Sequence, residues 1–494
     1  MRRREFLYGA GMVGAAGVVP SWMVGRGNSN SNSRFPSGMT TKKTGNGDGG
    51  SNGNSDSNDE VLRGTLSVDF GAKVAEVPAD YVGLSYESAQ LANPEFFAAG
   101  NVGLIGLFKE LGAAGVLRLG GGTSEFTAFT REEVAGPAPF DAVGPDTSKN
   151  VKGDTPITLK ALRNLRGFLD ACGWRCLYGL NGGRGSVDRA VDEAAAVFEA
   201  LGPRLIAFQL GNEPDAWRNR YRPATWTYED YRGEWVAARA AVLKRVPGAK
   251  FAGPDVSNKV AYVTGFAADA KAHWPEVVML TSHYYAMGPA GAKDVNLAKL
   301  LGVDAKLERD LKVIMEAARG AGLPYRMDEG NSCWNGGQEG VSDTLASALW
   351  VVDMMMDFAA GGCAGVNLHG GGKGFYTPIA GSLAEGFVRR PEFFGMMLAQ
   401  EFVGGTVVSS RLECGDADVR AYAALKDGEK MVLLVNKTER EVEVRVPMER
   451  AKARWVLSGP GMGAKEGVGV VKGVGGVLRG ELRVGAASAV LVRG

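Results

Sequence analysis

Between about residue 80 and residue 400, short apolar runs alternate with longer stretches whose apolar residues recur at helical spacing. The runs expected to be strands are Tyr81–Tyr86, Val116–Leu119, Cys176–Leu180, Leu205–Leu210, Lys250–Ala252, Val277–Ser282, Tyr325–Asp328 and Gly365–Leu368. The clearest helical patterns are Ile157–Ala171, Asp188–Leu201, Tyr228–Arg245, Ala305–Gly320 and Leu345–Ala360. Eight such repeats favour an α/β fold, a (β/α)8 TIM barrel over residues 79–402, and leave a doubly wound open sheet as the alternative.

The last part of the chain has a different pattern. Short runs, most of them rich in Val and several alternating in polarity, are separated by Gly, Asp and Lys turns, which predicts an antiparallel β-sandwich over residues 403–494. The expected strands are Thr406–Arg411, Val419–Leu425, Lys430–Val435, Glu441–Val446, Ala453–Leu457 and Ala489–Val492. Because Leu62–Phe70 alternates in the same way, we expect residues 61–78 to add a strand to this sandwich.

The N-terminal 60 residues are not expected to belong to either domain. Arg3-Arg4 followed by an apolar stretch from Phe6 to Val19 is similar to a bacterial twin-arginine export signal over residues 1–24, with a general secretion signal as the alternative. The stretch is too short to span a membrane. Residues 25–60 are mostly Gly, Asn, Ser and Asp, which is typical of a disordered linker. We therefore expect an exported protein, periplasmic or extracellular, with no membrane span in its mature form.

Charge and composition exclude several classes of function. Lys and Arg number 56 against 55 Asp and Glu, a net charge of +1, so no overall field favours nucleic acid. There are only three His, the five Cys are scattered, and no nucleotide-binding fingerprint is present. We expect no metal and no cofactor, and a Cys172–Cys176 disulfide stays an open question.

Two carboxylates follow predicted barrel strands. Strand four leads into Asn212-Glu213-Pro214, and strand seven leads into Glu329. A single Glu at such a position is often only a solvated loop charge. The C-terminal ends of barrel strands, however, build the active site, so this pair is expected at one rim, facing each other across the barrel mouth.

Such a pair, without metal ligands, is what glycosidic bond cleavage requires. One carboxyl must stay protonated to donate to the leaving oxygen, and the other must be ionised to attack or stabilise the anomeric carbon. Asn212 can donate a hydrogen bond to a sugar 2-hydroxyl. These requirements suggest Glu213 as acid/base and Glu329 as nucleophile.

At these motifs the chain resembles a known family. Asn212-Glu213-Pro214 with a strand-seven Glu is similar to the large clan of retaining barrel glycosidases. The segments 116–126, 209–215, 282–285 and 369–376 resemble the heparanase and β-glucuronidase group, glycoside hydrolase family 79. The resemblance covers residue 62 to the C-terminus and implies a C-terminal β-sandwich completed by an N-terminal strand.

The resemblance also implies roles for further residues. Tyr285 would hydrogen-bond the nucleophile with His283 beside it, and Glu87 and Asp146 would bind sugar hydroxyls. His369 begins the strand-eight loop, in which Gly374, Phe375 and Tyr376 would bind a uronate carboxylate. Trp334 stands where related enzymes have a Tyr beside the nucleophile, which weakens the expectation of strict glucuronate preference.

We therefore expect a retaining exo-β-glucuronidase whose partner is a β-glucuronide or a related oligosaccharide. A changed sugar preference, for 4-O-methylglucuronate or a neutral hexose, is the main alternative. Endo-cleavage of the heparanase type is less favoured because no basic cluster occurs beyond the signal region. A non-catalytic carbohydrate-binding protein is disfavoured because both carboxylates are present.

Overall fold

The computed structural model describes residues 61–132, 154–415 and 418–494, which belong to one compact unit. The predicted signal peptide, linker and Asp146 lie outside these residues. No helix in the described part of the chain is both long and apolar enough to cross a membrane. All five cysteines are buried free thiols, so Cys172 and Cys176 do not form a disulfide here.

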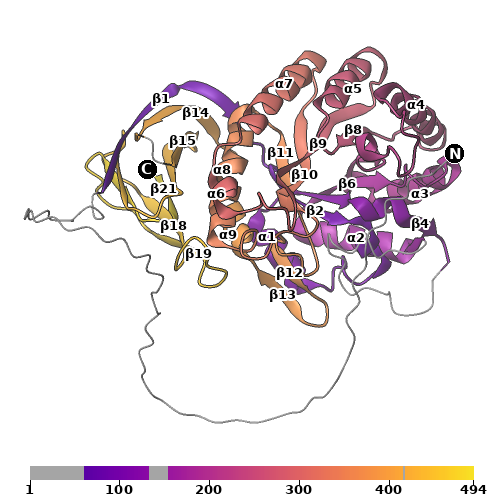
Figure 1. Cartoon of the computed structure of the whole chain (residues 1–494). Coiled ribbons are helices and arrows are strands. Elements are labelled where there is room, and N and C mark those ends of the chain that lie inside the picture. Colours follow the sequence, from indigo (N-terminus) through magenta and orange to yellow (C-terminus); the bar gives the residue numbers. More distant parts are fainter. Residues whose placement is uncertain (1–60, 133–153, 416–417) are drawn as a thin grey trace, which may run out of the picture. The chain divides into compact units, whose positions relative to one another are not determined.

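Eight parallel strands close into a barrel in the order β10-β11-β2-β3-β6-β7-β8-β9 (Figure 1), which confirms the predicted fold class and excludes the open sheet. Each strand contains one of the predicted runs or most of it, and β8, β9 and β10 continue well beyond the predicted ends. The barrel strands are β2 Val82–Glu87, β3 Val116–Gly120, β6 Arg175–Leu180, β7 Leu205–Leu210, β8 Phe251–Val256, β9 Val277–Pro289, β10 Tyr325–Trp334 and β11 Gly365–Gly370.

Helices follow the strands and pack around them. They are α1 Val102–Leu111, α2 Leu159–Cys172, α3 Val187–Leu201, α4 Tyr228–Arg245, α5 Val260–His273, α6 Leu297–Leu301, α7 Ala305–Ala321, α8 Leu345–Gly361 and α9 Pro391–Gln400. The predicted helix from Ile157 was wrong at its start. Residues Thr155–Thr158 form strand β5, and the Thr158 side chain then caps α2 by accepting a hydrogen bond from the Ala161 amide.

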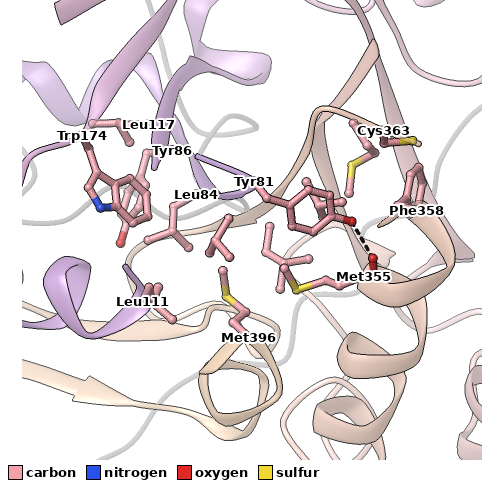
Figure 2. Packing of buried hydrophobic residues seen from close by; sticks show 14 of the residues in the cluster. Tyr81, Leu84, Tyr86, Leu111, Leu117, Trp174, Met355, Phe358, Cys363 and Met396 are labelled. Carbon is pink, nitrogen blue, oxygen red and sulfur yellow. Dashed lines mark hydrogen bonds between the residues drawn. The ribbon is translucent and has the colours of Figure 1, made fainter. Parts of the chain in front are cut away.

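The barrel is held by apolar side chains that fill the space between strands and helices. Figure 2 shows Tyr81 beside β2 and Tyr86 within it, with Trp174 near Tyr86, and the Tyr81 hydroxyl donating to the Met355 carbonyl of α8. Burial of such large side chains contributes roughly 1.5–3 kcal/mol each. The strand ends are thereby held rigidly at the rim where polar side chains are presented.

A second domain is built on one nine-stranded sheet in the order β19-β18-β21-β16-β15-β14-β1-β17-β20. Its strands are β1 Leu62–Glu76, β14 Thr406–Glu413, β15 Val419–Lys426, β16 Glu429–Asn436, β17 Val442–Arg445, β18 Ala453–Ser458, β19 Gly469–Val474, β20 Glu481–Val484 and β21 Ser488–Arg493. Strand β1 lies between β14 and β17, as the strand predicted from residues 61–78 requires.

The pairing is not antiparallel throughout. Strand β1 runs antiparallel to β14 but parallel to β17, with Leu62 opposite Val442. A hairpin would impose an antiparallel pair, but β1 and β17 are joined through the whole barrel, so their direction is free. The strands β19 and β20, and the small pairs β4 (Thr127–Thr130) with β5 and β12 (Ile379–Ser382) with β13 (Gly386–Arg389), were not predicted.

The sheet folds over itself and also packs on the barrel. Aliphatic residues of β16 and β21, such as Leu434 and Val490, share an inner cluster with Val444 of β17. On the other face, Tyr422 donates to an Asp353 oxygen of α8 at 2.5 Å, and Lys437 pairs with the same carboxylate at 2.9 Å. The two domains are therefore joined through α8.

Candidate active site

Glu213 and Glu329 lie at the C-terminal rim of the barrel and line one cavity of about 940 Å³. Glu213 follows β7 and its side chain is 28% exposed, whereas Glu329 lies within β10 and is 7% exposed. An oxygen of each carboxylate and one nitrogen of His283 lie within 4.8 Å of one another. The two acids therefore face each other across a narrow gap, as their positions on strands four and seven predict.

A strained turn presents Glu213. Gly211 (φ 89°) and Glu213 (φ 49°) both have left-handed backbone conformations, which a residue with a side chain rarely adopts. The turn is held because the Glu213 amide donates to the Asp255 carbonyl at 2.9 Å and the Trp217 indole donates to the Asn212 carbonyl at 2.8 Å. Strain of this kind is typical of functional sites.

A bulge in β10 presents Glu329. Met327 pairs with Ser282 of β9 and Glu329 pairs with the next residue, His283, so Asp328 is an additional residue in the strand. In a regular strand, consecutive side chains point to opposite faces. Here the bulge lets Asp328 and Glu329 both contact Arg118 in the barrel interior.

Glu329 is surrounded by positive and hydrogen-bonding groups. The fully buried Arg118 donates to its Oε2, Tyr285 donates to its Oε1 at 2.9 Å, and His369 Nδ1 lies 3.7 Å away. Burial by itself would raise the pKa of Glu329. The His369 and His283 rings and the Arg118 guanidinium outweigh burial and lower that pKa to about 2. Glu329 is therefore ionised at neutral pH and suited to act as a nucleophile.

Glu213 has a histidine as its partner, with His283 Nδ1 3.0 Å from its Oε1. Burial raises the pKa of Glu213, the negative charge of Glu329 adds to this, and the hydrogen bond with His283 partly offsets it. The two carboxyls are thus held in opposite states, one ionised and one disposed to keep its proton, which is the arrangement that acid/base chemistry on one bond needs.

Arg118, from β3, connects the site beneath these carboxylates. Its Nη2 donates to Asn212 Oδ1 and to Asp255 Oδ2, both at 2.7 Å. Gln209 donates to Asp255 at 2.6 Å and to Asp328 at 2.5 Å, so one amide joins both carboxyls. Arg118, Gln209, Asp255 and Asp328 were not predicted as site residues. For Arg118 the sequence did contain a signal, namely a charged residue inside an apolar strand. Burying such a charge is costly unless it is paired.

The buried charges balance. Burial lowers the pKa of His283, but Glu329 and Asp255 outweigh it and raise that pKa well above its usual value. Burial would raise the pKa of Asp255, which Arg118 and His283 instead hold below its usual range. Burial and the charge of Asp255 raise the pKa of Asp328 well above the usual range, which favours its protonated form. Arg118 and His283, favoured as cations, thus face Glu329 and Asp255, favoured as anions.

Two groups of side chains have the spacing of metal ligands, and both contain His283. One is completed by Glu213 and Glu329, and the other by Asp255 and Asp328. Arg118 contacts Glu329 and Asp255 directly and lies 3.4 Å from His283 Nε2. Because the guanidinium already supplies positive charge to members of both groups, they fit a metal ion poorly.

A further buried acid, Glu125, holds the turn from behind. Its carboxylate accepts from the Asn212 amide at 2.7 Å and from the Gly183 amide. Burial raises the pKa of Glu125 to about 7, and the two amides oppose this. Glu125 lies within segment 116–126, one of the segments that carry the family resemblance, but its contact with Asn212 was not predicted.

The remaining predicted residues fall into two groups. Glu87 and His369 are buried beside each other at the cavity, with His369 Nε2 3.5 Å from Glu87 Oε1, and Glu87 also accepts from the Thr123 amide at 2.8 Å. Tyr376 and the half-exposed Trp334 line the cavity as well. These positions are compatible with sugar binding, and the roles of these residues stay predictions.

Gly374 and Phe375 are not among the residues that line the cavity. The Phe375 amide, expected to face a uronate, donates instead to the Gly336 carbonyl at 2.6 Å. The reason is that the loop after β11 packs on the loop after β10, where Gly337 lies against Tyr376. Of the three residues expected to bind a uronate carboxylate, Tyr376 is the one that lines the cavity in the described structure.

Comparison with known proteins finds no family model that matches. The chain is 25% identical to a β-glucuronidase of Aspergillus niger over 368 residues, and 24% identical to one of Neurospora crassa over 385 residues. Both alignments cover 68% of this chain, and they span 65% and 66% of those relatives.

Among solved structures, a 4-O-α-L-rhamnosyl-β-D-glucuronidase from Fusarium oxysporum matches with a TM-score of 0.67 at 17% identity, covering 87% of this chain and all of that one. An α-L-arabinofuranosidase from Thermotoga maritima matches with a TM-score of 0.63 at 14% identity, covering 87% and 99%. The chain therefore has the fold of barrel glycosidases of differing specificity.

Proposed function

We propose that the protein is a glycoside hydrolase that removes a terminal β-linked glucuronic acid. The observation that carries this proposal is the contrast between the two carboxyls that share one cavity. Glu329 is ionised by its partners, whereas burial and the charge of Glu329 favour the protonated form of Glu213. Glycosidic bond cleavage needs one carboxyl of each kind, on either side of the scissile bond.

The proposed reaction is a double displacement. Glu329 attacks the anomeric carbon while Glu213 gives its proton to the leaving oxygen, which produces a covalent glycosyl-enzyme. Glu213 then takes a proton from water, and that water releases the sugar with retained configuration. Retaining enzymes hold their carboxyls about 5–5.5 Å apart and inverting ones about 6.5–9.5 Å. The approach of oxygens of Glu213 and Glu329 to within 4.8 Å favours retention.

The glucuronide specificity is supported by two relatives that are named β-glucuronidases and by the structural similarity to a rhamnosyl-glucuronidase. The motifs at segments 209–215, 282–285 and 369–376 further support membership of glycoside hydrolase family 79. The predicted export signal supports action outside the cytoplasm, on glucuronides that reach the periplasm or the medium.

A neutral sugar is the second candidate, and a specific observation favours it. The backbone amide of Phe375, which would serve a uronate carboxylate, is already bonded to Gly336. Trp334 lines the cavity at the position where a Tyr was expected beside the nucleophile. A β-glucoside would need neither a free amide nor a positive group at this position.

The proposal is tested by comparing release of 4-nitrophenol from the β-glucuronide and from the β-glucoside. We expect the glucuronide to be preferred and Glu329→Gln to reduce kcat by at least about 10⁴-fold, since the nucleophile is lost. Glu193→Gln is the matched control, because Glu193 is also a buried barrel glutamate but pairs with Tyr178 outside the cavity.

Faster release from the glucoside would overturn the uronate assignment and leave the mechanism intact. Proton NMR of the first-formed sugar checks the stereochemistry. Appearance of the β-anomer before the α-anomer is expected, and the reverse order would contradict the double displacement.

A further inference from the structure

Asn212, which precedes Glu213, has three of its four polar groups bonded within the protein. Its backbone amide donates to Glu125 Oε1 at 2.7 Å, and its carbonyl accepts from the Trp217 indole at 2.8 Å. Its side-chain Oδ1 accepts from Arg118 Nη2 at 2.7 Å. Because a guanidinium only donates hydrogen bonds, the amide oxygen of Asn212 must face Arg118, and this fixes the orientation of the side chain.

The fourth group is the side-chain NH2 of Asn212. In the described part of the chain, the three bonds above are the hydrogen bonds of Asn212, which leaves this NH2 for a ligand. Asn212 lines the cavity together with Glu213. An NH2 group in this place can donate to a sugar 2-hydroxyl, as expected from the sequence. The groups that hold Asn212 therefore bear on how that hydroxyl is recognised.

Glu125 joins three loops at the rim of the barrel. It belongs to the short 3-10 helix Gly122–Phe126, which follows β3. Its two carboxylate oxygens accept from the Asn212 amide after β7 and from the Gly183 amide after β6. Glu125 is only 1% exposed, and burial of a carboxylate is costly unless its oxygens are bonded. One buried side chain thus ties together the ends of three neighbouring strands of the barrel.

The packing around this carboxylate is close. A methyl group added at Gly183 would lie 2.7 Å from Glu125 Oε2, and one added at Gly211 would lie 3.6 Å from Oε1. The absence of a side chain at Gly183 therefore lets the carboxylate reach the backbone. Glu125 is held in one place by the same loops that it joins.

The bond from Asn212 to Glu125 matters because the turn around Asn212 is strained. Glu213 has φ 49°, a left-handed conformation that persists only where the surroundings hold it. The Glu213 amide has its own acceptor, the Asp255 carbonyl at 2.9 Å, whereas the Asn212 amide is held by Glu125. Loss of the Glu125 carboxylate would therefore release Asn212 before it releases Glu213.

We propose that Glu125 is a positioning residue for recognition of the 2-hydroxyl of the substrate, and that it acts through Asn212. Glu125 is not among the residues that line the cavity. The inference rests on the proposed function because it needs a glycoside in that cavity. A Glu125 that served stability alone would affect all substrates alike, whereas a positioning residue changes the discrimination between sugars with and without a 2-hydroxyl.

The test compares 4-nitrophenyl β-glucuronide with its 2-deoxy analogue, and the quantity measured is the kcat/KM of the first divided by that of the second. The intrinsic reactivities of the two sugars cancel when this ratio is compared between variants. We expect Glu125→Gln to lower the ratio at least about tenfold. Glutamine has one acceptor oxygen where the carboxylate has two, so one backbone amide faces an NH2 group and the side chain must move.

Glu193→Gln is the matched control, since Glu193 is a buried glutamate bonded to Tyr178 away from the cavity. Its ratio should stay within about twofold of the wild-type ratio, whatever its effect on stability.

A second comparison asks whether Glu125 acts through Asn212. Asn212→Ala removes the NH2 group and is expected to lower the ratio at least as much as Glu125→Gln does. In the Asn212→Ala background, Glu125→Gln should lower the ratio by less than about twofold more, because both changes remove the same contact.

Gly183→Ala keeps the carboxyl and serves where Glu125→Gln does not fold. The backbone at Gly183 is not left-handed, so alanine itself is tolerated, but its methyl group displaces Glu125 Oε2. We expect the ratio to fall at least about threefold. Gly233→Ala, whose methyl group would have no atom within 4 Å, is the matched control.

The proposal is overturned, with the proposed function intact, if the glycosides are cleaved and the ratio stays at the wild-type value in Glu125→Gln and Gly183→Ala, or in Asn212→Ala. A further fall of the ratio in the Asn212→Ala background contradicts it as well. If the β-glucoside is the better substrate, it and its 2-deoxy analogue are compared, and the same ratios decide. Absence of cleavage of all these glycosides by the wild type would overturn the proposed function and the role of Glu125 together.

Discussion

The interior of the barrel and the inner layer of the sheet domain are both buried, but they are built from opposite kinds of side chains. Beneath the barrel rim lie Arg118, Asp255, Asp328 and His283, all at most 5% exposed and joined by hydrogen bonds. The inner cluster of the sheet is aliphatic, with residues such as Leu434 and Val444. Its ion pairs, such as Lys452 with Glu429, lie at more exposed positions.

The barrel interior serves the proposed chemistry, whereas the inner cluster of the sheet serves stability. Buried charges cost desolvation energy that their partners offset only when every group is paired. The barrel interior bears that cost because it sets the two acids in opposite protonation states. The inner cluster of the sheet has no such requirement, so its burial of hydrocarbon contributes to folding without the cost of desolvating buried charges.

The largest expected effect is that of Arg118→Met, which removes the cation shared by Glu329 and Asp255. Unpaired buried charge costs about 3–5 kcal/mol of folding free energy. We expect kcat/KM to fall at least about 10³-fold because Glu329 loses a partner that keeps it ionised. Urea unfolding and 4-nitrophenyl glycoside kinetics measure both.

Arg131→Met is the control for this substitution, since Arg131 and its partner Asp192 are both about half exposed. Exposed pairs contribute at most about 1 kcal/mol. Equal losses in the two variants would show that the barrel interior does not depend on its buried cation.

Leu434→Ala is expected to have the next largest effect, on stability alone. Leu434 is fully buried in the inner cluster of the sheet, and such truncations cost about 2–5 kcal/mol. The kcat/KM of the folded protein should stay within about twofold, because the sheet contributes no residue to the lining of the cavity. A loss of activity in fully folded protein would show that the active site depends on the packing of the sheet domain. Val471→Ala, at a position 67% exposed, serves as control.

The smallest effect distinguishes two neighbouring acids. Asp328→Asn replaces a carboxyl whose protonated form is favoured, so kcat/KM should change less than about fivefold. Asp255→Asn removes a charge that Arg118 and His283 require, and we expect a loss of about 10²-fold. Kinetics at neutral pH compare the two substitutions. Equal losses would contradict the assigned protonation states.

Much of the fold and the position of the two acids could be predicted. The eight strand predictions were correct because barrel strands are buried on both faces and appear as continuous apolar segments. Glu213 and Glu329 stood out as a pair, because each follows a predicted barrel strand and the ends of such strands meet at one rim. Strands β19 and β20 were missed, since a short or Gly-rich strand has a weak periodic signal.

The network around the acids could not be predicted in the same way. Arg118 lies 211 positions from Glu329, and its contact with Asp255 depends on which strands close the barrel. The bulge that lets both Asp328 and Glu329 contact Arg118 depends on the register between β9 and β10. The alternation of residue types in the sequence does not reveal that register. The bond between the Phe375 amide and Gly336 joins two loops whose packing has no local signature.

The sequence by itself determined the alternation of strands and helices, the two domains and the pair of glutamates, because local propensity and hydrophobic period act over a few residues. Only the tertiary structure decided which charge faces which. It set Glu329 against a buried guanidinium and Glu213 against a histidine. Protonation states and cavities depend on distances between groups that are far apart in the chain, and folding alone sets those distances.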